Sequence, residues 1–475
     1  MGDFDFVVIG SGPAGEKGAA QAAYFGKRVA IVERAVQPGG APVNTGGIPT
    51  KTLREAASYL TGFRRRDLYG VGLGLTPELT LDRLRARAAD VTETMASAVR
   101  ANLERHKIEL VPGVAALGKD RSVRVTGPDG SEALLRGEAV LIATGSRPLH
   151  PPGIDFADPD VHDSDSVLDL DRIPKSVVVI GGGPVGSEFA SIFTALGVEV
   201  ALIDMADRLI PFADAEISAM LRAIFIEMGM QVRLGSPLAR VERSGATLTV
   251  TMADGDSLEP EMVLFAAGRV GNTEGLDCEQ AGVKLDERGR VLVDHHYQTS
   301  VPGIFAAGDV IGPPALGSVS AEQGRVAACH AFGIPFKETV DDLPPFGVYS
   351  IPEVGMVGMT EEDAAAAAIR YQVGRARFSD NARSQIAGTT EGMIKLVLRS
   401  DDRRLLGVHI VGEEASELIH QGQAVIHTGG TIDRFIHATF NMPTRSEAYK
   451  YAAYDALQNL ALAGADSGGS QSEER

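Results

Sequence analysis

The chain opens with a short apolar run, residues 4–9, that ends in the glycine-rich stretch Gly10-Ser11-Gly12-Pro13-Ala14-Gly15. Helix-forming residues follow as far as Phe25, and residues 29–32 make a second apolar run that ends in Glu33. Two apolar strands joined by a helix predict a βαβ unit of a parallel sheet. The glycine-rich stretch stands where such a unit binds a dinucleotide.

Each glycine of this stretch has an expected role in binding a pyrophosphate. Gly10 permits the tight turn, Gly12 lets the backbone approach the ligand, and Gly15 allows the helix to pack closely on the strand. The pyrophosphate would lie at the helix N-terminus, where free N–H groups and the helix dipole favour anions. Glu33 is placed to accept hydrogen bonds from a ribose.

The same pattern occurs a second time. Residues 177–180 are apolar and lead into Gly181-Gly182-Gly183-Pro184-Val185-Gly186, after which a helix is expected to Leu196. Residues 198–203 form the next apolar run, which ends in Asp204. The chain therefore holds two copies of one dinucleotide-binding module.

Both copies continue with segments typical of a β meander and close with Ala-x-Gly, at residues 143–145 and 266–268. The first copy is the longer, because it contains the helical segment that begins near Lys51 and a second, long helix. We interpret the first copy as a module elaborated around a bound group and the second as a plain dinucleotide site.

The rest of the chain does not repeat this pattern. A strand at residues 304–306 places Asp309 at its end, just before a helix rich in small residues. From about Phe346 strands and amphipathic segments alternate without a nucleotide fingerprint. After about Leu462 the residues are mostly Gly, Ser, Asp, Gln and Glu, which predicts a disordered tail.

Composition narrows the choice of partners. The formal net charge of -18 argues against nucleic acid or an anionic membrane as a partner. The two cysteines, Cys278 in an acidic stretch expected to be exposed and Cys329 in an Ala-rich helix, are too few for a metal cluster. We expect both to be free thiols of a reducing compartment. With no apolar run of about 18 residues and a strand expected at the N-terminus, we expect a cytoplasmic location.

The stretch Gly39-Gly40-Ala41-Pro42-Val43-Asn44-Thr45-Gly46-Gly47-Ile48-Pro49-Thr50-Lys51 carries the most specific signal. It resembles the active-site segment G-G-x-C-x-N-x-G-C-I-P-[ST]-K of the flavoprotein disulfide reductases, such as dihydrolipoamide dehydrogenase and glutathione reductase. In that family the two cysteines form a redox disulfide against the flavin. Pro42 and Gly47 stand at those positions here, so the frame is kept without the disulfide.

The resemblance covers residues 3 to about 460 and implies an α/β fold. We expect two Rossmann-like dinucleotide-binding domains, one for FAD and one for NAD(P), and a C-terminal α+β dimerisation domain that makes a homodimer. The expected division is 1–150 and 276–345 for the two parts of the FAD domain, 151–275 for the NAD(P) domain, 346–462 for the dimer domain and 463–475 for the tail.

The resemblance also assigns site residues. Lys51 is expected near the reactive nitrogen of the flavin, paired with Glu188, and Asp309 is expected on the ribityl chain of FAD. The expected FAD-binding set is Gly10, Gly12, Pro13, Ala14, Gly15, Glu33, Gly40, Lys51, Thr144, Gly145, Gly308 and Asp309. The expected NAD(P)-binding set is Gly181, Gly183, Val185, Gly186, Glu188, Asp204, Gly268 and Arg269. No metal site is expected.

The C-terminal segment also lacks a residue that the family uses in disulfide chemistry. The family usually ends in H-P-T-x-[ST]-E, whose histidine handles protons for the disulfide, and here Met442 precedes Pro443-Thr444-Arg445-Ser446-Glu447. His437, five residues upstream, is interpreted as structural. Loss of both cysteines and of their proton donor suits hydride exchange between a flavin and a nicotinamide, which needs neither.

One subgroup, the soluble pyridine nucleotide transhydrogenases, resembles the chain in the segments 44–56, 268–273 and 440–444. The leading hypothesis is a transhydrogenase that uses FAD to move hydride between NADP(H) and NAD(H). Asp204 favours NAD, because it would accept from the 2′-OH and repel a 2′-phosphate. Two alternatives stay open: an NADH-dependent reductase (diaphorase) that passes electrons to a quinone, dye or oxygen, and a catalytically silent binding subunit.

Overall fold

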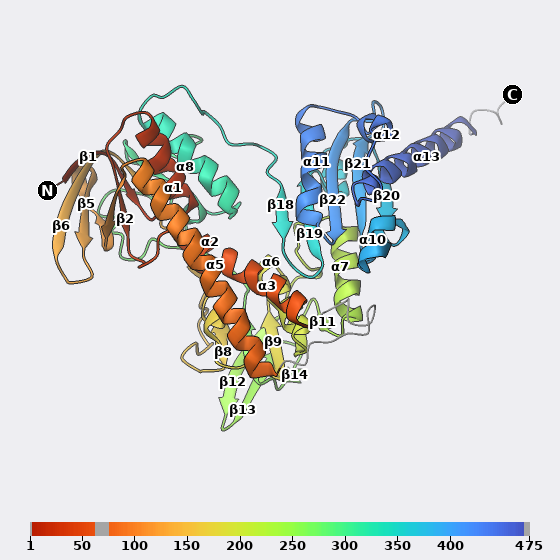
Figure 1. The fold of residues 1–475 in the computed structure, drawn as a ribbon, viewed down its shortest axis with the longest axis horizontal. Helices are drawn as coiled ribbons and strands as arrows, with labels where there is room; N and C mark the ends of the chain where they lie inside the picture. Colours follow the sequence, from red (N-terminus) through yellow and green to blue (C-terminus); the bar gives the residue numbers. More distant parts are fainter. Residues whose placement is uncertain (1, 62–75, 470–475) are drawn as a thin grey trace.

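The computed structural model describes residues 2–61 and 76–469, arranged around three larger sheets (Figure 1). The first sheet has seven strands in the order β3-β2-β1-β6-β5-β4, with β17 paired to β6. Its strands are β1 Gly2–Ile9, β2 Val29–Glu33, β3 Glu109–Pro112, β4 Val114–Leu117, β5 Ser122–Thr126, β6 Glu132–Ile142 and β17 Ile304–Ala306.

Strands β1, β2 and β3 are parallel, whereas β4, β5 and β6 form the expected antiparallel meander. Two helices, α1 (Pro13–Tyr24) and α8 (Gly317–Ala331), pack closely against each other. A Cβ atom on Gly324 of α8 would overlap the carbonyl of Ala14 on α1, so only glycine permits this approach. The segment between β2 and β3 contains α2 (Gly40–Asn44), α3 (Ile48–Thr61) and the long α5 (Pro77–Arg105).

The second sheet repeats the first in reduced form. Its five strands are all parallel, in the order β11-β10-β9-β15-β8, and a separate three-stranded antiparallel sheet follows β11. This arrangement confirms the internal repeat predicted from the sequence. The strands are β8 Val161–Asp163, β9 Ser176–Ile180, β10 Glu199–Ile203, β11 Gln231–Arg233, β15 Met262–Phe265, and in the smaller sheet β12 Leu238–Ser244, β13 Thr247–Met252 and β14 Ser257–Leu258.

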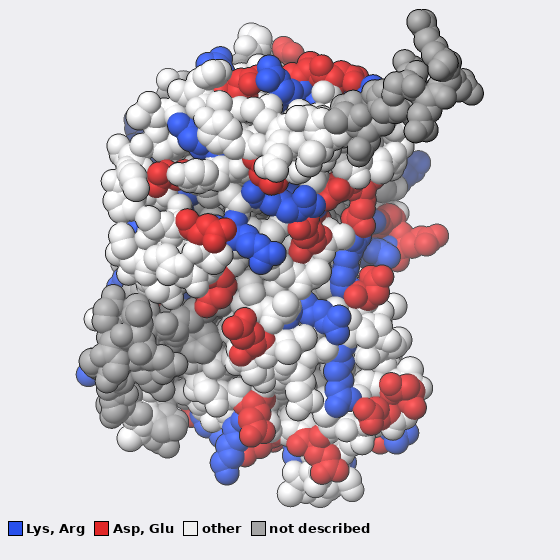
Figure 2. All heavy atoms as spheres, turned by 90° about the vertical axis from the view of Figure 1, so that its right-hand side faces the viewer, with Lys and Arg blue, Asp and Glu red and all other residues white. Residues whose placement is uncertain are grey.

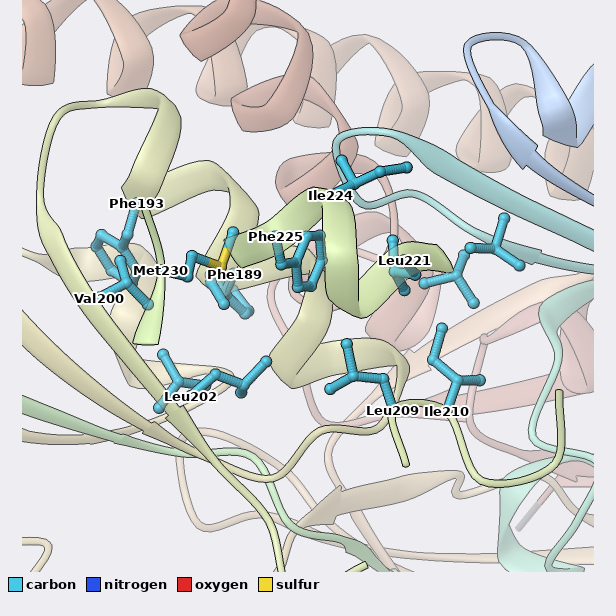
Figure 3. Packing of buried hydrophobic residues seen from close by; sticks show 14 of the residues in the cluster. Phe189, Phe193, Val200, Leu202, Leu209, Ile210, Leu221, Ile224, Phe225 and Met230 are labelled. Atoms are coloured by element: carbon cyan, nitrogen blue, oxygen red, sulfur yellow. The ribbon is translucent and has the colours of Figure 1, made fainter. Parts of the chain in front are cut away.

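Helices α6 (Pro184–Ala195) and α7 (Ala215–Glu227) cover this second sheet. Figure 3 shows their core, in which Phe189 and Phe225 pack with Leu202 of β10. A two-stranded ribbon of β7 (Ser146–Pro148) and β16 (Arg269–Gly271) runs where the chain passes between the two sheets.

The third sheet is antiparallel, in the order β18-β19-β22-β21-β20. Its strands are β18 Phe346–Val348, β19 Glu353–Gly358, β20 Tyr371–Arg377, β21 Met393–Arg399 and β22 Leu405–Gly412, and its helices are α9 Glu361–Ala366, α10 Ala382–Ala387, α11 Ala415–His427, α12 Asp433–His437 and α13 Glu447–Gly469. The short 3₁₀ helices of the chain are η1 Lys119–Arg121, η2 Ser166–Asp169, η3 Asp309–Ile311 and η4 Phe378–Asp380.

Two expectations need correction. Helix α13 continues to Gly469, so disorder from residue 463 is wrong for 463–469, and residues 470–475 lie outside the described part of the chain. Cys278 is buried among apolar side chains rather than exposed, although Asp277 and Glu279 flank it. Burial raises the pKa of its thiol to about 11. Cys329 is buried as well, and both are free thiols.

The face of the third sheet's domain mixes both signs of charge. On the side drawn in Figure 2, acidic and basic residues are interspersed, and no continuous basic patch is visible outside the grey residues. Within residues 2–61 and 76–469, no helix has the length and hydropathy of a bilayer span.

Candidate functional site

Two glycines of the first turn, Gly10 and Gly15, have no space for a side chain. Gly10 has φ +99°, and a Cβ atom there would overlap the carbonyl oxygen of Ala143. A Cβ atom on Gly15 would overlap the carbonyl of Gly10, so helix α1 begins directly against the turn. Pro13 and Ala14 occupy the first turn of that helix, where proline has no hydrogen bond to lose.

A second backbone segment meets this turn. A Cβ atom on Gly40, at the start of α2, would lie 2.7 Å from the Cα of Gly12. The two glycines therefore place backbone N–H groups of α1 and α2 side by side. Such a cradle of backbone donors without side chains suits a pyrophosphate.

Glu33 is buried at the end of β2 and organises this cradle. Its carboxylate accepts hydrogen bonds from the backbone N of Ser11 at 2.9 Å and the Ser11 hydroxyl at 2.6 Å, and from the backbone N of Ala35 at 2.8 Å. The Ser11 hydroxyl in turn accepts from the backbone N of Gly39 at 2.9 Å. Glu33 thus holds the two glycine segments in register, a role that the sequence did not indicate.

The first Ala-x-Gly closure is bonded to the segment that follows the second closure. The Thr144 hydroxyl donates to the carbonyl of Asn272 at 2.7 Å, and the Asn272 amide donates to the carbonyl of Thr144 at 2.9 Å. The backbone N of Asn272 donates to the carbonyl of Gly145 at 2.9 Å. These bonds join the first module to the segment that follows Gly268 of the second.

A chain of polar contacts connects Arg269 to Asp309. The Ser146 hydroxyl donates to Asp309 at 2.7 Å and accepts from the Arg269 guanidinium at 2.9 Å. Gly308, with φ +83°, donates its backbone N–H to the side chain of Gln323 on α8 at 2.8 Å. Ser146 and Gln323 are site residues that the sequence analysis missed, because nothing in a lone serine or glutamine marks such a contact.

Positions 42 and 47 face each other across the turn between α2 and α3. A Cβ atom on Gly47 would lie 2.6 Å from the Cα of Pro42 and 2.5 Å from its carbonyl oxygen. The structure therefore places side by side the two residues that stand where the resembled family has cysteines.

Lys51 and Glu188 form the predicted ion pair. Lys51 Nζ lies 2.7 Å from Glu188 Oε2, although the residues are 137 positions apart. Glu188 is buried on α6, and its other oxygen accepts from the backbone N of Tyr349 at 3.0 Å. Lys51 Nζ also lies 5.2 Å from the centre of the Tyr349 ring. Tyr349 was missed by sequence reasoning, yet it joins the third sheet's domain to the pair.

The environment raises the pKa of Tyr349. Burial is the largest cause, and the nearby carboxylates of Glu353, Glu417 and Glu188 act in the same direction. Tyr349 therefore stays protonated at neutral pH and presents a neutral ring to Lys51.

The second glycine turn reproduces the first. Gly181 has φ +117°, and a Cβ atom there would lie 2.8 Å from the carbonyl of Ala266. A Cβ atom on Gly186 would overlap the carbonyl of Gly181, and Gly183 is the N-cap of α6. Val185, in the first turn of α6, packs against the core of this module. The steric requirement for glycine is thus the same in both copies.

Asp204 lies beside this turn at the end of β10. One carboxylate oxygen accepts from the backbone N of Gly182, and the other accepts from the backbone N of Ala206 at 2.7 Å. Arg208, the cation of the same loop, is paired with Glu362 at 2.8 Å. The loop therefore presents a carboxylate at the strand end, while its arginine contacts an acidic residue of another domain.

A groove of about 650 Å³ opens beside Lys51 between α3 and α5. Its lining combines apolar, polar and charged side chains, with more cations than anions: Ile48, Lys51, Thr52, Glu55, Ala56, Tyr59, Arg83, Arg87 and Val91. At the other end of the chain, Met442 is 79% exposed and His437 is exposed, so neither meets Lys51 within the described chain.

Comparison with known proteins agrees with this geometry. Residues 4–324 match the family described as pyridine nucleotide-disulphide oxidoreductase, and residues 344–453 match its dimerisation domain. A soluble pyridine nucleotide transhydrogenase of Mycobacterium bovis is 43% identical over 97% of this chain and 98% of its own. A protein of the same description from Colwellia psychrerythraea is 39% identical over 96% and 99%.

Solved structures give the same result. The HOCl-induced flavoprotein disulfide reductase RclA of Escherichia coli superposes with a TM-score of 0.85 at 28% identity, covering 95% of this chain and 99% of its own. Matches that span nearly the whole chain, in sequence and in structure, show that the chain belongs to the pyridine nucleotide-disulphide oxidoreductase family.

Proposed function

We propose that the protein is an FAD-dependent transhydrogenase that moves hydride between NADPH and NAD⁺ without a redox disulfide. The observation that carries the proposal is the contact of Pro42 with Gly47, next to the intact Lys51–Glu188 pair. The relatives described as soluble pyridine nucleotide transhydrogenases support it along nearly the full length.

The described residues fit FAD in the first module. The cradle at Gly12 and Gly40 offers backbone N–H groups, and a Cβ atom on Gly40 would collide with the backbone of Gly12. Glu33 would hold the adenosine ribose, and Asp309, positioned by Ser146, would hold the ribityl chain. When bound, FAD supplies the chemistry by accepting a hydride from one nicotinamide and returning it to another.

The second module would bind NAD(H) and NADP(H) in turn at Gly181, Gly183 and Gly186. Asp204 favours the 2′-OH of NAD(H), and Arg208 is engaged by Glu362 rather than available for a 2′-phosphate. NADPH would therefore bind more weakly than NADH at this site. A single site that both nucleotides visit in turn implies ping-pong kinetics.

Lys51 would place a fixed positive charge beside the reacting ring. Glu188 holds the Lys51 ammonium group, and the backbone N of Tyr349 holds the Glu188 carboxylate. The pair lies in a partly buried position where three domains meet. Preorganised charge of this kind stabilises charge that develops during transfer without moving at the moment of reaction. Pro42 and Gly47 provide no thiol, so electrons on the flavin have no internal acceptor at these positions.

Anaerobic mixing of the flavin-loaded dimer with NADPH and thio-NAD⁺ tests the proposal. Flavin-dependent formation of thio-NADH, with parallel lines in double-reciprocal plots, is the expected result. Reduction of the flavin by NADH without thio-NADH formation from NADPH would contradict it.

The groove beside Lys51 favours a second candidate function, an NADH-dependent reductase that passes electrons to a quinone or dye. Its volume of about 650 Å³ suits a small planar acceptor, and Asp204 suits NADH as donor. Rapid NADH oxidation with a quinone, in a preparation that forms no thio-NADH from NADPH, would select this function.

The chain is a homodimer through its dimerisation domain, residues 344–453. Large side chains near the end of that domain are exposed on the single chain, among them Met442, Tyr451 and Tyr454, as expected for a surface that a second copy covers. We propose a cytoplasmic location, supported by the two buried free thiols, which suit a reducing compartment.

A further inference from the structure

Three of the ten histidines of the chain lie together on the domain of the first sheet, and none of them has a role in the site described above. His295 and His296 lie in the turn between Val293 and Thr299, two residues that pair in an antiparallel bridge. Their ring centres are 3.8 Å apart. The ring of His296 also stacks on His330, near the end of α8, with centres 4.1 Å apart and planes 6° from parallel.

We propose that Asp294, His295 and His296 bind one divalent late transition-metal ion, with Zn²⁺ as the representative species. One ligand atom of each residue lies within 4.8 Å of the others. Ligand atoms of a tetrahedral zinc ion are about 3.4 Å apart, given bond lengths near 2.1 Å. The side chains of Asp294 and His295 are exposed and free to rotate. A displacement of their ligand atoms by about 1 Å would bring the separations to the value that zinc requires.

The turn that carries these residues is already ordered. One oxygen of Asp294 accepts from the backbone N of His296 at 2.8 Å and of Gln298 at 2.9 Å. Gln298 also bridges to Phe305 of β17, which fixes the base of the turn against the first sheet. The second oxygen of Asp294 makes no hydrogen bond within the described chain and can serve as a ligand.

The imidazole rings are equally available. None of the rings of His295, His296 and His330 makes a hydrogen bond within residues 2–61 and 76–469. Neutral imidazole nitrogens are the ligands that Zn²⁺ and Cu²⁺ prefer, and a carboxylate completes a mixed nitrogen and oxygen set.

The position of the site sets its role. His330 lies seven residues beyond Gln323 on α8, on the order of 10 Å along the helix axis from the residue that holds Gly308. All three ligands lie within the 294–298 turn, so an ion there would link side chains of the turn to one another and would not contact the reacting rings. The site is therefore a structural metal site, distinct from the hydride-transfer chemistry.

Zinc titration of the flavin-loaded dimer tests this site. After dialysis against a chelator, calorimetry should detect one Zn²⁺ per subunit, and His295→Ala with His296→Ala should weaken binding at least about tenfold. The control variant His437→Ala removes an exposed histidine elsewhere and should keep the wild-type affinity. FAD content confirms that each variant is folded.

A second measurement identifies the ligands. Cu²⁺ added to the same protein should give an electron paramagnetic resonance spectrum with nitrogen hyperfine splitting that the double variant lacks. Asp294→Asn keeps the acceptor of the turn but removes the charge, and it should also weaken Zn²⁺ binding. Absence of Zn²⁺ binding to the wild type, or equal affinity in the double variant, would overturn the proposal.

Discussion

A Cβ atom on Gly47 would lie 2.6 Å from the Cα of Pro42, so the backbones at these two positions are in direct contact. A disulfide needs Cβ atoms about 3.8 Å apart, which this turn cannot hold without a backbone shift. At the two positions where the family has cysteines, this turn therefore brings the backbones too close together for a disulfide. This contact packs the residue before α3 directly on α2 without a covalent link.

The contact between Pro42 and Gly47 predicts that alanine substitutions at two adjacent glycines change the free energy of unfolding by different amounts. Gly47→Ala should lower the free energy of unfolding by about 1–3 kcal/mol, because the new methyl group would press on the backbone of Pro42. Gly46→Ala is the matched control, since a Cβ atom there meets open space, and its effect should stay within about 0.5 kcal/mol. Denaturant unfolding followed by circular dichroism measures both, and equal destabilisation would contradict the close contact.

Lys51→Met should slow hydride transfer by about tenfold to a hundredfold while FAD stays bound, because it removes the fixed charge beside the reacting ring. Glu188→Gln should have a smaller effect, since Gln can still accept from the backbone N of Tyr349. Stopped-flow reduction of the flavin by NADH separates this step from binding. A Lys51→Met enzyme with the wild-type rate of flavin reduction would limit the pair to a structural role.

A surface arginine of the third sheet gives a control for charge alone. Arg399, the last residue of β21, pairs with Asp402, and the two side chains are 38% and 48% exposed. Arg399→Met should leave the rate of flavin reduction unchanged, because an exposed pair is screened by solvent. A slower rate in this variant would mean that the assay reports general electrostatics rather than the Lys51–Glu188 pair.

Asp204→Ser should tighten NADPH binding about tenfold, because a carboxylate next to a 2′-phosphate is replaced by a neutral hydroxyl. Asp207→Ser is the matched control, since Asp207 lies in the same loop, is exposed and carries the same charge. Its effect on NADPH affinity should be less than about twofold at physiological salt. Titration of the flavin-loaded protein with NADP⁺ measures both, and unchanged affinity in Asp204→Ser would refute the role given to this residue.

Local steric rules explain why the sequence predicted the glycine turns so well. Gly10 and Gly181 have no space for a side chain, and that requirement is visible in any sequence that contains the turn. The Lys51–Glu188 pair joins residues 137 positions apart, so only the resemblance to a family predicted it. Tyr349 escaped notice because it contributes a backbone N–H and a ring face, neither of which has a sequence signature.

The two corrected expectations have a common physical origin. The charged neighbours Asp277 and Glu279 suggested that Cys278 is exposed. The Cys278 side chain instead packs in the core, so the charge of the flanking residues did not indicate whether this side chain is buried. Polar composition after Leu462 suggested disorder, whereas the helix begun at Glu447 continues to Gly469. In both cases the neighbouring structure outweighed the local composition.

A buried network links the second module to the dimerisation domain and is expected to control stability. Lys395 of β21 is 1% exposed and contacts three carboxylates: Asp214 at 2.8 Å, Glu216 at 3.0 Å, and Glu361. Lys395→Met should lower the free energy of unfolding by about 3–5 kcal/mol, because it leaves the buried Asp214 carboxylate without a counter-charge. Denaturant unfolding measures this loss, and a cost below about 1 kcal/mol, the value for an exposed pair such as Arg399–Asp402, would contradict the buried network.

The same network predicts how stability depends on pH. Burial disfavours the charged form of Asp214, but hydrogen bonds from Lys395 outweigh it and lower the pKa of this carboxyl from its usual value. A carboxyl whose folded pKa is lowered contributes stability above its unfolded pKa of about 3.9 and loses it as pH falls through the folded value. The wild-type protein should therefore lose stability as pH falls below about 4, and Asp214→Asn should lose less over that interval, because it has no proton to bind. Unfolding curves recorded from pH 6 downward measure the two slopes, and parallel curves would show that Asp214 does not contribute to acid unfolding.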